Sequence, residues 1–154
     1  MYKRILVPLD GSAAADRGLR EAIRLARQQR ATLRLLHVID QSAMAAYPEP
    51  GFYAPDLLEV LESRGRKLLD AASKRARKHK IRVDTFLYSR YARVADVIVK
   101  QARVWRADII VLGTHGRRGM VRLLMGSDAE QVLRNSPVPV LLVRAQGRSS
   151  RRSR

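Results

Sequence analysis

Residues 108–127 read DIIVLGTHGRRGMVRLLMGS, and this stretch decides the fold. The apolar run 109–112 followed by Gly113 indicates a buried strand that ends at a turn. Gly116 is followed, after nine further residues, by Gly126 and Ser127. Serine is a favoured residue at the start of a helix. The stretch therefore predicts a strand, a glycine-rich loop and a helix, in that order.

The same alternation of strand and helix runs through the rest of the chain. Short apolar runs predict strands, and stretches with an apolar residue at every third or fourth position predict helices. The predicted strands are 5–9, 33–39, 83–88, 108–112 and 137–143, and the predicted helices are one capped by Ser12 and others over 56–80, 94–102 and 127–133. This order predicts an α/β fold: a single-domain, five-stranded parallel sheet sandwiched by helices.

Parallel sheets of this kind bind ligands beyond the carboxyl ends of their strands, where the strand order reverses. At one such end, Gly113 and Gly116 let backbone amides approach phosphate oxygens closely. The helix start at Ser127 adds amides with partial positive charge, Arg117 adds a full charge, and His115 lies between the glycines. The segment from Gly113 to Ser127 therefore predicts a phosphate-binding loop.

The residues alone leave other interpretations open. A G-x-x-G turn also occurs in KH nucleic-acid-binding domains, but there it joins two helices, whereas here it follows a strand. Asp10 suits a helix cap and a ribose contact about equally. His37 is expected to pack within its strand, and the three histidines of the chain are too scattered to predict a metal site.

The loop resembles the universal stress protein family, whose ATP-binding members carry G-x-x-G, nine residues and then G-S or G-T. Residues 5–12 are similar to the family's first strand and turn, 37–38 to its second strand and 136–143 to its last strand. The resemblance implies an adenine-nucleotide α-hydrolase-like (Rossmann-like) domain over residues 1–144. It also implies a stress-response or regulatory protein that binds ATP, with Mg²⁺ carried by the nucleotide. Hydrolysis needs a positioned base or water-orienting group, and the nearby candidates are only Asp10, His115 and Asp128, so slow turnover at most is expected.

The resemblance further implies the roles of individual residues. Asp10 would contact the ribose, and the backbone around the other adenine-site residues would surround the base. The adenine-site residues are Pro8, Leu9 and Val38, and the residues for ribose and phosphates are Leu112, Gly113, Gly116, Gly126 and Ser127, with His115, Arg117 and Asp128 close by.

Asp128 departs from the family pattern, which usually has a small apolar or hydroxyl residue after the serine. A carboxylate beside phosphates repels them unless a cation lies between. The sequence therefore predicts a steep dependence of ATP binding on Mg²⁺.

Charge and composition bound the alternatives. The formal net charge is +17, which keeps nucleic acid or another polyanion as a less favoured partner, because aromatic residues are only 5% of the chain. An ATP-using enzyme of the α-hydrolase-like group is a second alternative, but the pyrophosphate loop after the first strand and G-x-x-x-x-G-K-[ST] are missing. Cysteine is absent, which excludes disulfides and thiolate chemistry.

The chain ends give the last expectations. The first apolar run stops at Asp10, which indicates a strand instead of a signal peptide, and no run approaches the length of about 18 residues needed to span a membrane. A cytoplasmic location is therefore expected.

Residues 145–154 are Gly, Ser, Arg and few others, which predicts a basic disordered tail. Alternating apolar residues in 138–143 predict an unpaired edge strand and a homodimer formed through it.

Overall fold

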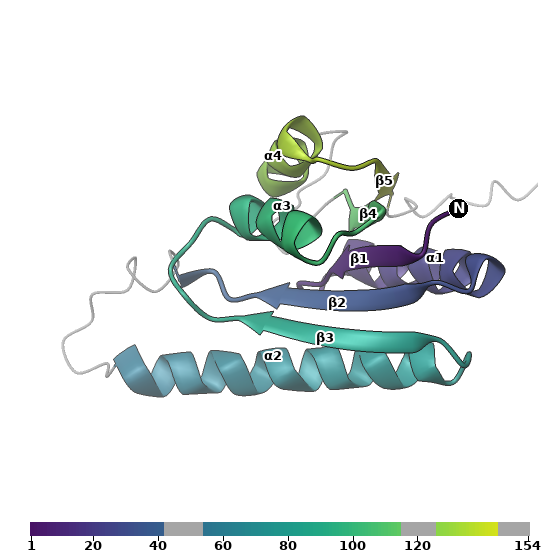
Figure 1. Ribbon diagram of the computed structural model, residues 1–154. Coiled ribbons are helices and arrows are strands. Elements are labelled where there is room, and N and C mark those ends of the chain that lie inside the picture. Colours follow the sequence, from purple (N-terminus) through teal and green to yellow (C-terminus); the bar gives the residue numbers. More distant parts are fainter. Residues whose placement is uncertain (42–53, 115–125, 145–154) are drawn as a thin grey trace, which may run out of the picture.

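The computed structural model describes residues 1–41, 54–114 and 126–144 (Figure 1). Strands and helices alternate along the chain, as the periodicity of the sequence predicts. The elements are β1 (Arg4–Pro8), α1 (Ala13–Gln29), β2 (Thr32–Val38), α2 (Ala54–Arg77), β3 (Arg82–Tyr88), α3 (Val94–Val104), β4 (Ile109–Gly113), α4 (Ser127–Asn135) and β5 (Val140–Val143). None of the helices in these three described ranges is both long and apolar enough to cross a membrane.

The five strands form one parallel sheet with the order β3-β2-β1-β4-β5. The chain therefore builds outwards from β1 through β2 to β3 and then returns to the other side of β1 with β4 (Figure 1). The strand order reverses between β1 and β4. This architecture confirms the predicted α/β fold with a five-stranded parallel sheet flanked by helices.

Helices cover both faces of the sheet. Successive side chains of a strand point to opposite faces, and apolar side chains of the central strands therefore need partners on each face. On β1, Ile5 and Val7 pack in one buried cluster with α1 and α2, whereas Leu6 packs in a second cluster with α3 and α4. On β4, Ile110 lies in the second cluster and Val111 in the first. Both central strands are thus buried on both faces, which explains why their sequences read as continuous apolar runs.

The last strand is shorter than predicted. The sequence pattern placed its start at Pro137, but β5 begins at Val140. Proline has no amide hydrogen, so neither Pro137 nor Pro139 can donate to the sheet ladder. The Pro139 carbonyl accepts a hydrogen bond from the Ile110 amide at 3.0 Å, and regular pairing follows from there.

The charged side chain of Arg34, on the face of the sheet that α3 covers, joins β2 to its neighbours. The guanidinium of Arg34 donates to the Asp84 carboxylate of β3 (Nε to Oδ2, 2.7 Å) and to Gln101 of α3 (Nη1 to Oε1, 3.3 Å). Its central carbon lies 4.8 Å from the centre of a Trp105 ring. The side chain of Arg34 is 16% exposed. Pairing and stacking together compensate for the loss of hydration of this charge.

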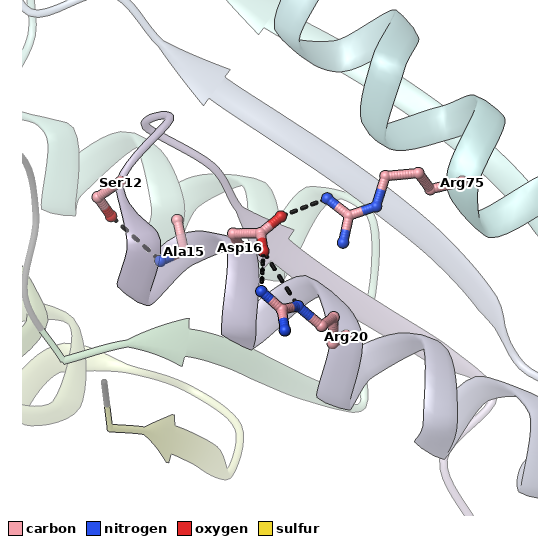
Figure 2. A network of polar contacts seen from close by, with 5 residues as sticks. All are labelled: Ser12, Ala15, Asp16, Arg20 and Arg75. Carbon is pink, nitrogen blue, oxygen red and sulfur yellow. Dashed lines mark hydrogen bonds and ion pairs between the residues drawn. The ribbon is translucent and has the colours of Figure 1, made fainter. Parts of the chain in front are cut away.

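A second polar network ties α1 to α2 (Figure 2). Ser12 caps α1, as predicted, because its Oγ accepts a hydrogen bond from the Ala15 amide at 3.1 Å. In the first turn, Asp16 accepts from Nε of Arg20 at 3.0 Å and pairs with Arg75 of α2. Burial works to raise the pKa of the Asp16 carboxyl, but hydrogen bonds and charges from Arg75 and Arg20 outweigh it and hold the pKa below its usual value.

We expect Asp16→Asn to lower the free energy of unfolding at neutral pH by about 1 kcal/mol, since the three side chains are partly exposed and screened by solvent. A carboxyl with a lowered pKa in the folded state contributes stability above its unfolded pKa, and that contribution disappears as the pH falls through the folded value. Urea denaturation should therefore show wild type and variant converging in acid.

Asp70→Asn is the matched control, because Asp70 pairs with Lys74 on the exposed surface of α2. It should cost only about 0.3 kcal/mol at neutral pH. Equal losses in both variants would mean that Asp16 does not link the two helices.

Candidate functional site

In an open parallel sheet, the crevice for ligands lies outside the carboxyl ends of the strands where the strand order reverses, and here that position is at the ends of β1 and β4. β1 and β4 are adjacent and parallel, with Ile5 opposite Ile109 and Leu6 opposite Ile110. Their ends at Pro8 and Gly113 therefore come to the same edge, together with the start of α1. In open parallel sheets this is the position at which ligands bind.

Gly113 allows α1 to rest directly on the end of β4. A Cβ built on Gly113 would lie 2.5 Å from the carbonyl carbon of Ala14 and 2.7 Å from the nitrogen of Ala15. On the helix side, a Cβ on Gly18 would lie 3.4 Å from the nitrogen of Gly113. The two glycines bring two backbones into contact. The glycine pattern predicts close approach to a phosphate but not this packing role of Gly113, which depends on a partner far along the chain.

The turn between β1 and α1 is fixed by Asp10 and Ser12. The Asp10 carboxylate accepts a hydrogen bond from the Ser12 amide at 2.9 Å, and Gly11 between them adopts a left-handed φ of 80°. The helix cap is Ser12, so the structure assigns Asp10 to shaping the turn instead of capping α1. Asp10 is half-buried and follows the end of β1 at the carboxyl edge of the sheet.

The two ends of the glycine-rich segment are joined by backbone hydrogen bonds. The Thr114 amide donates to the Val143 carbonyl of β5 at 3.0 Å, and the Gly126 amide donates to the Thr114 carbonyl at 2.9 Å. Thr114 is buried. These bonds hold the start of α4 beside the end of β4. Its cap residue is Gly126, which has no side chain to offer the first amides, and both Ser127 and Asp128 are exposed.

On the other side of the crevice, the end of β2 supports the end of β1. The Leu9 amide donates to the Leu36 carbonyl at 2.8 Å. The Leu9 carbonyl lies 2.7 Å from Nδ1 of His37 and can only accept, so this ring nitrogen carries the hydrogen in that contact. A Cβ on Gly65 of α2 would lie 2.7 Å from Cδ2 of His37. His37 thus orients the Leu9 peptide, beyond the strand packing that the sequence predicts.

The structure brings most of the predicted site residues to this one edge. They are Pro8, Leu9 and Asp10 after β1, Val38 at the end of β2, Leu112 and Gly113 at the end of β4, and Gly126, Ser127 and Asp128 at the start of α4. His115, Gly116 and Arg117 lie outside the described residues, as does the tail 145–154. Among the residues that the structure does describe, no group of three His, Cys, Asp or Glu side chains could hold a metal ion.

The fold defines the class of protein, which is an open, parallel α/β domain of the Rossmann-like type. The two ends of its glycine-rich segment are joined at the point where the strand order reverses. The sequence model of the universal stress protein family matches residues 1–144. The chain belongs to this family, and the resemblance found in its sequence is confirmed.

Individual relatives agree with this assignment. A universal stress protein of Methanocaldococcus jannaschii is 33% identical over 144 residues, which are 94% of this chain and 83% of the relative. A solved structure of a universal stress protein family member from Burkholderia pseudomallei is 32% identical, with a TM-score of 0.77, over 94% of this chain and 97% of that one. The universal stress protein of Archaeoglobus fulgidus, solved in complex with dAMP, is 26% identical, with a TM-score of 0.65, over 92% of this chain and 98% of that one.

We expect Gly113→Ala to lower the free energy of unfolding by about 3 kcal/mol, the upper end of the usual cost of overpacking, because its Cβ would meet backbone atoms that cannot rotate away. Gly11→Ala is the comparison: its Cβ meets open space, and only the positive φ is unfavourable, at about 1 kcal/mol. Urea denaturation without nucleotide measures both. A Gly113→Ala protein as stable as wild type would show that α1 does not rest on β4 in this way.

Proposed function

We propose that this chain binds ATP in the crevice between the ends of β1 and β4. The observation that carries the proposal is the hydrogen bond from the Gly126 amide to the Thr114 carbonyl, which brings the start of α4 to the end of β4. A helix start at this position presents backbone amides to a phosphate. The complex of the Archaeoglobus fulgidus relative with dAMP supports an adenine nucleotide as the ligand.

The proposed contacts divide the nucleotide along the edge of the sheet. The backbone of Pro8, Leu9 and Val38 surrounds the adenine, and the His37 contact keeps the Leu9 peptide in one orientation. Asp10 accepts from the ribose. The phosphates lie against Leu112, Gly113, Gly126 and Ser127, with His115, Gly116 and Arg117 contributing from the segment outside the described residues.

The proposed role is regulatory. Hydrolysis needs a positioned base as well as charge stabilisation, and one oxygen of Asp10 already accepts from the Ser12 amide. We therefore propose a cytoplasmic stress-response protein with slow ATP turnover at most. In this proposal residues 1–144 form the binding domain, and the basic tail 145–154 is dispensable for nucleotide affinity.

The acidic first turn of α4 makes a Mg²⁺ ion necessary for tight binding of a triphosphate in this site. Asp128 and Glu130 both lie in this turn, and both are exposed. Carboxylates suit the positive end of the helix dipole, but they repel a triphosphate placed there. A Mg²⁺ ion carried by the nucleotide would lie between the two sets of oxygens and remove the repulsion.

We expect Asp128→Val to tighten metal-free ATP binding about tenfold and to reduce the gain that Mg²⁺ gives, because one carboxylate no longer opposes the phosphates. Gly126→Val should abolish binding with or without metal, since a β-branched side chain would separate the backbone from the phosphates. Isothermal titration with ATP, with Mg²⁺ or with chelator, measures these affinities, and competition by AMP identifies the adenine site.

Two results would contradict this arrangement. Unchanged affinities in Asp128→Val would mean that the carboxylate points away from the phosphates. If the Gly126→Val protein bound ATP with wild-type affinity and AMP competed for the site, the start of α4 would not be part of the nucleotide site.

We also propose a homodimer formed through β5. This strand is the last in the sheet order and pairs with β4 on one side. The Pro139 carbonyl accepts a hydrogen bond from Ile110 of β4, and the Val143 carbonyl accepts one from Thr114, which follows β4. By alternation, the backbone groups of Val140 and Leu142 face away from β4. An edge of this kind favours pairing with a second copy.

Light scattering at micromolar concentration should give the mass of a dimer. Leu142→Pro removes an outward-facing amide while the residues bonded to β4 keep theirs, and proline is tolerated at such edge positions. We expect this variant to be a folded monomer, with circular dichroism as the check of folding. A wild type that is monomeric with and without ATP would exclude the proposed dimer.

A further inference from the structure

A basic groove lies between α1 and the C-terminal end of α2, away from the crevice described above. Its volume is about 340 Å³. The cations that line it are Arg20, Arg24 and Arg27 of α1, Arg75 of α2 and Lys78 just beyond α2, with His79 next to them. The helices run antiparallel to the strands, so the Arg27 and Lys78 end lies towards the edge of the sheet opposite to the glycine-rich segment.

The groove keeps a net positive charge after its ion pairs are counted. Asp16 pairs with both Arg20 and Arg75, and Glu21 pairs with Arg24 (Figure 2 shows the Asp16 contacts). Within the described ranges, Arg27 and Lys78 form no ion pair with any carboxylate. Two carboxylates therefore face five cations.

The ion pairs also preorganise the groove. Asp16 holds the guanidinium groups of Arg20 and Arg75 close together from two different helices (Figure 2). A planar guanidinium that is already oriented loses less conformational freedom when it binds a second anion. The carboxylate thus acts as a clamp on the two arginines and leaves other N–H groups of each fork for a ligand.

The helix dipole accounts for only part of this arrangement. Cations near a helix C-terminus are favourable by themselves, which suits Arg27 and Lys78. Arg20 and Arg24 lie in earlier turns of α1, where the dipole has little effect. The chain also places cations where glycine is usual: Arg30 and Lys80, which follow the two helices, adopt left-handed φ values of 52° and 58°. This conformation is unfavourable for a residue that carries a Cβ.

The lining indicates which anion fits. The groove has no Phe, Tyr or Trp side chain, its one apolar residue, Ile23, is buried, and five of its seven lining residues are Arg or Lys. Guanidinium groups bind phosphate oxygens in pairs. The volume is that of a small-molecule site. We propose that this groove binds a short linear chain of phosphates, at a site separate from the nucleotide crevice.

The probe is inorganic tripolyphosphate, which carries linked phosphates without adenine. Binding is measured by isothermal titration at low salt in the Gly126→Val background, so that the nucleotide crevice does not contribute. The test variant reverses the two cations outside the ion pairs, Arg27→Glu with Lys78→Glu. The control variant is Arg64→Glu with Lys67→Glu. Both residues are exposed on α2 and lie outside the groove, and the two substitutions change the net charge by the same amount as those in the test variant.

We expect the groove variant to bind tripolyphosphate at least about tenfold more weakly and the control variant to keep its affinity within about twofold. AMP should not compete. Equal losses in both variants would show a response to net charge alone and overturn the site, as would no binding to the Gly126→Val protein. A DNA duplex that displaces tripolyphosphate and binds more tightly through the same two cations would overturn the proposed ligand.

Discussion

The contact between the backbone of β4 and the backbone of α1 is the constraint on which the rest of the site depends. It requires the absence of a side chain at Gly113, and it is supported from the helix side by Gly18. With the two backbones touching, the first turn of α1 reaches the carboxyl edge of the sheet beside the end of β4. The turn formed by Asp10, Gly11 and Ser12 then has only a short distance to span.

A second constraint closes the other side of the crevice through the main chain alone. β4 does not simply end: its next residue, Thr114, is bonded both to β5 and to the start of α4. Both backbone groups of Thr114 are therefore satisfied by distant segments, which suits its burial. The start of α4 is fixed relative to the sheet by these main-chain bonds.

Local patterns were enough to predict the elements. The run 109–112 reads as a buried strand because β4 is covered on both faces, and Ser12 reads as a cap because its hydroxyl serves an amide three residues away. The start of β5 was misplaced because the apolar alternation continues through two prolines that cannot donate to the ladder. The hydrophobic pattern therefore predicts the wrong start for β5, because the start is determined by which residues can donate a backbone hydrogen bond.

Contacts between distant residues could not be predicted in the same way. The donation from His37 to Leu9 requires β1 and β2 to be neighbours in a known register, and the Gly113–Ala14 contact requires the tilt of a helix on the sheet. The pairing of Asp16 with Arg75 joins residues far apart in the sequence. In each case the residue type was visible in the sequence, but the partner was set by packing.

The stacking of Arg34 on Trp105 has a spectroscopic consequence. Trp105 is the only tryptophan of the chain, and it lies at the end of α3. Its indole emission therefore reports on one small region, where β2, β3 and α3 meet around a cation. Excitation of tryptophan gives an intrinsic optical signal for the integrity of that layer, at the opposite end of the strands from the crevice. The protein thus carries a built-in reporter of its scaffold.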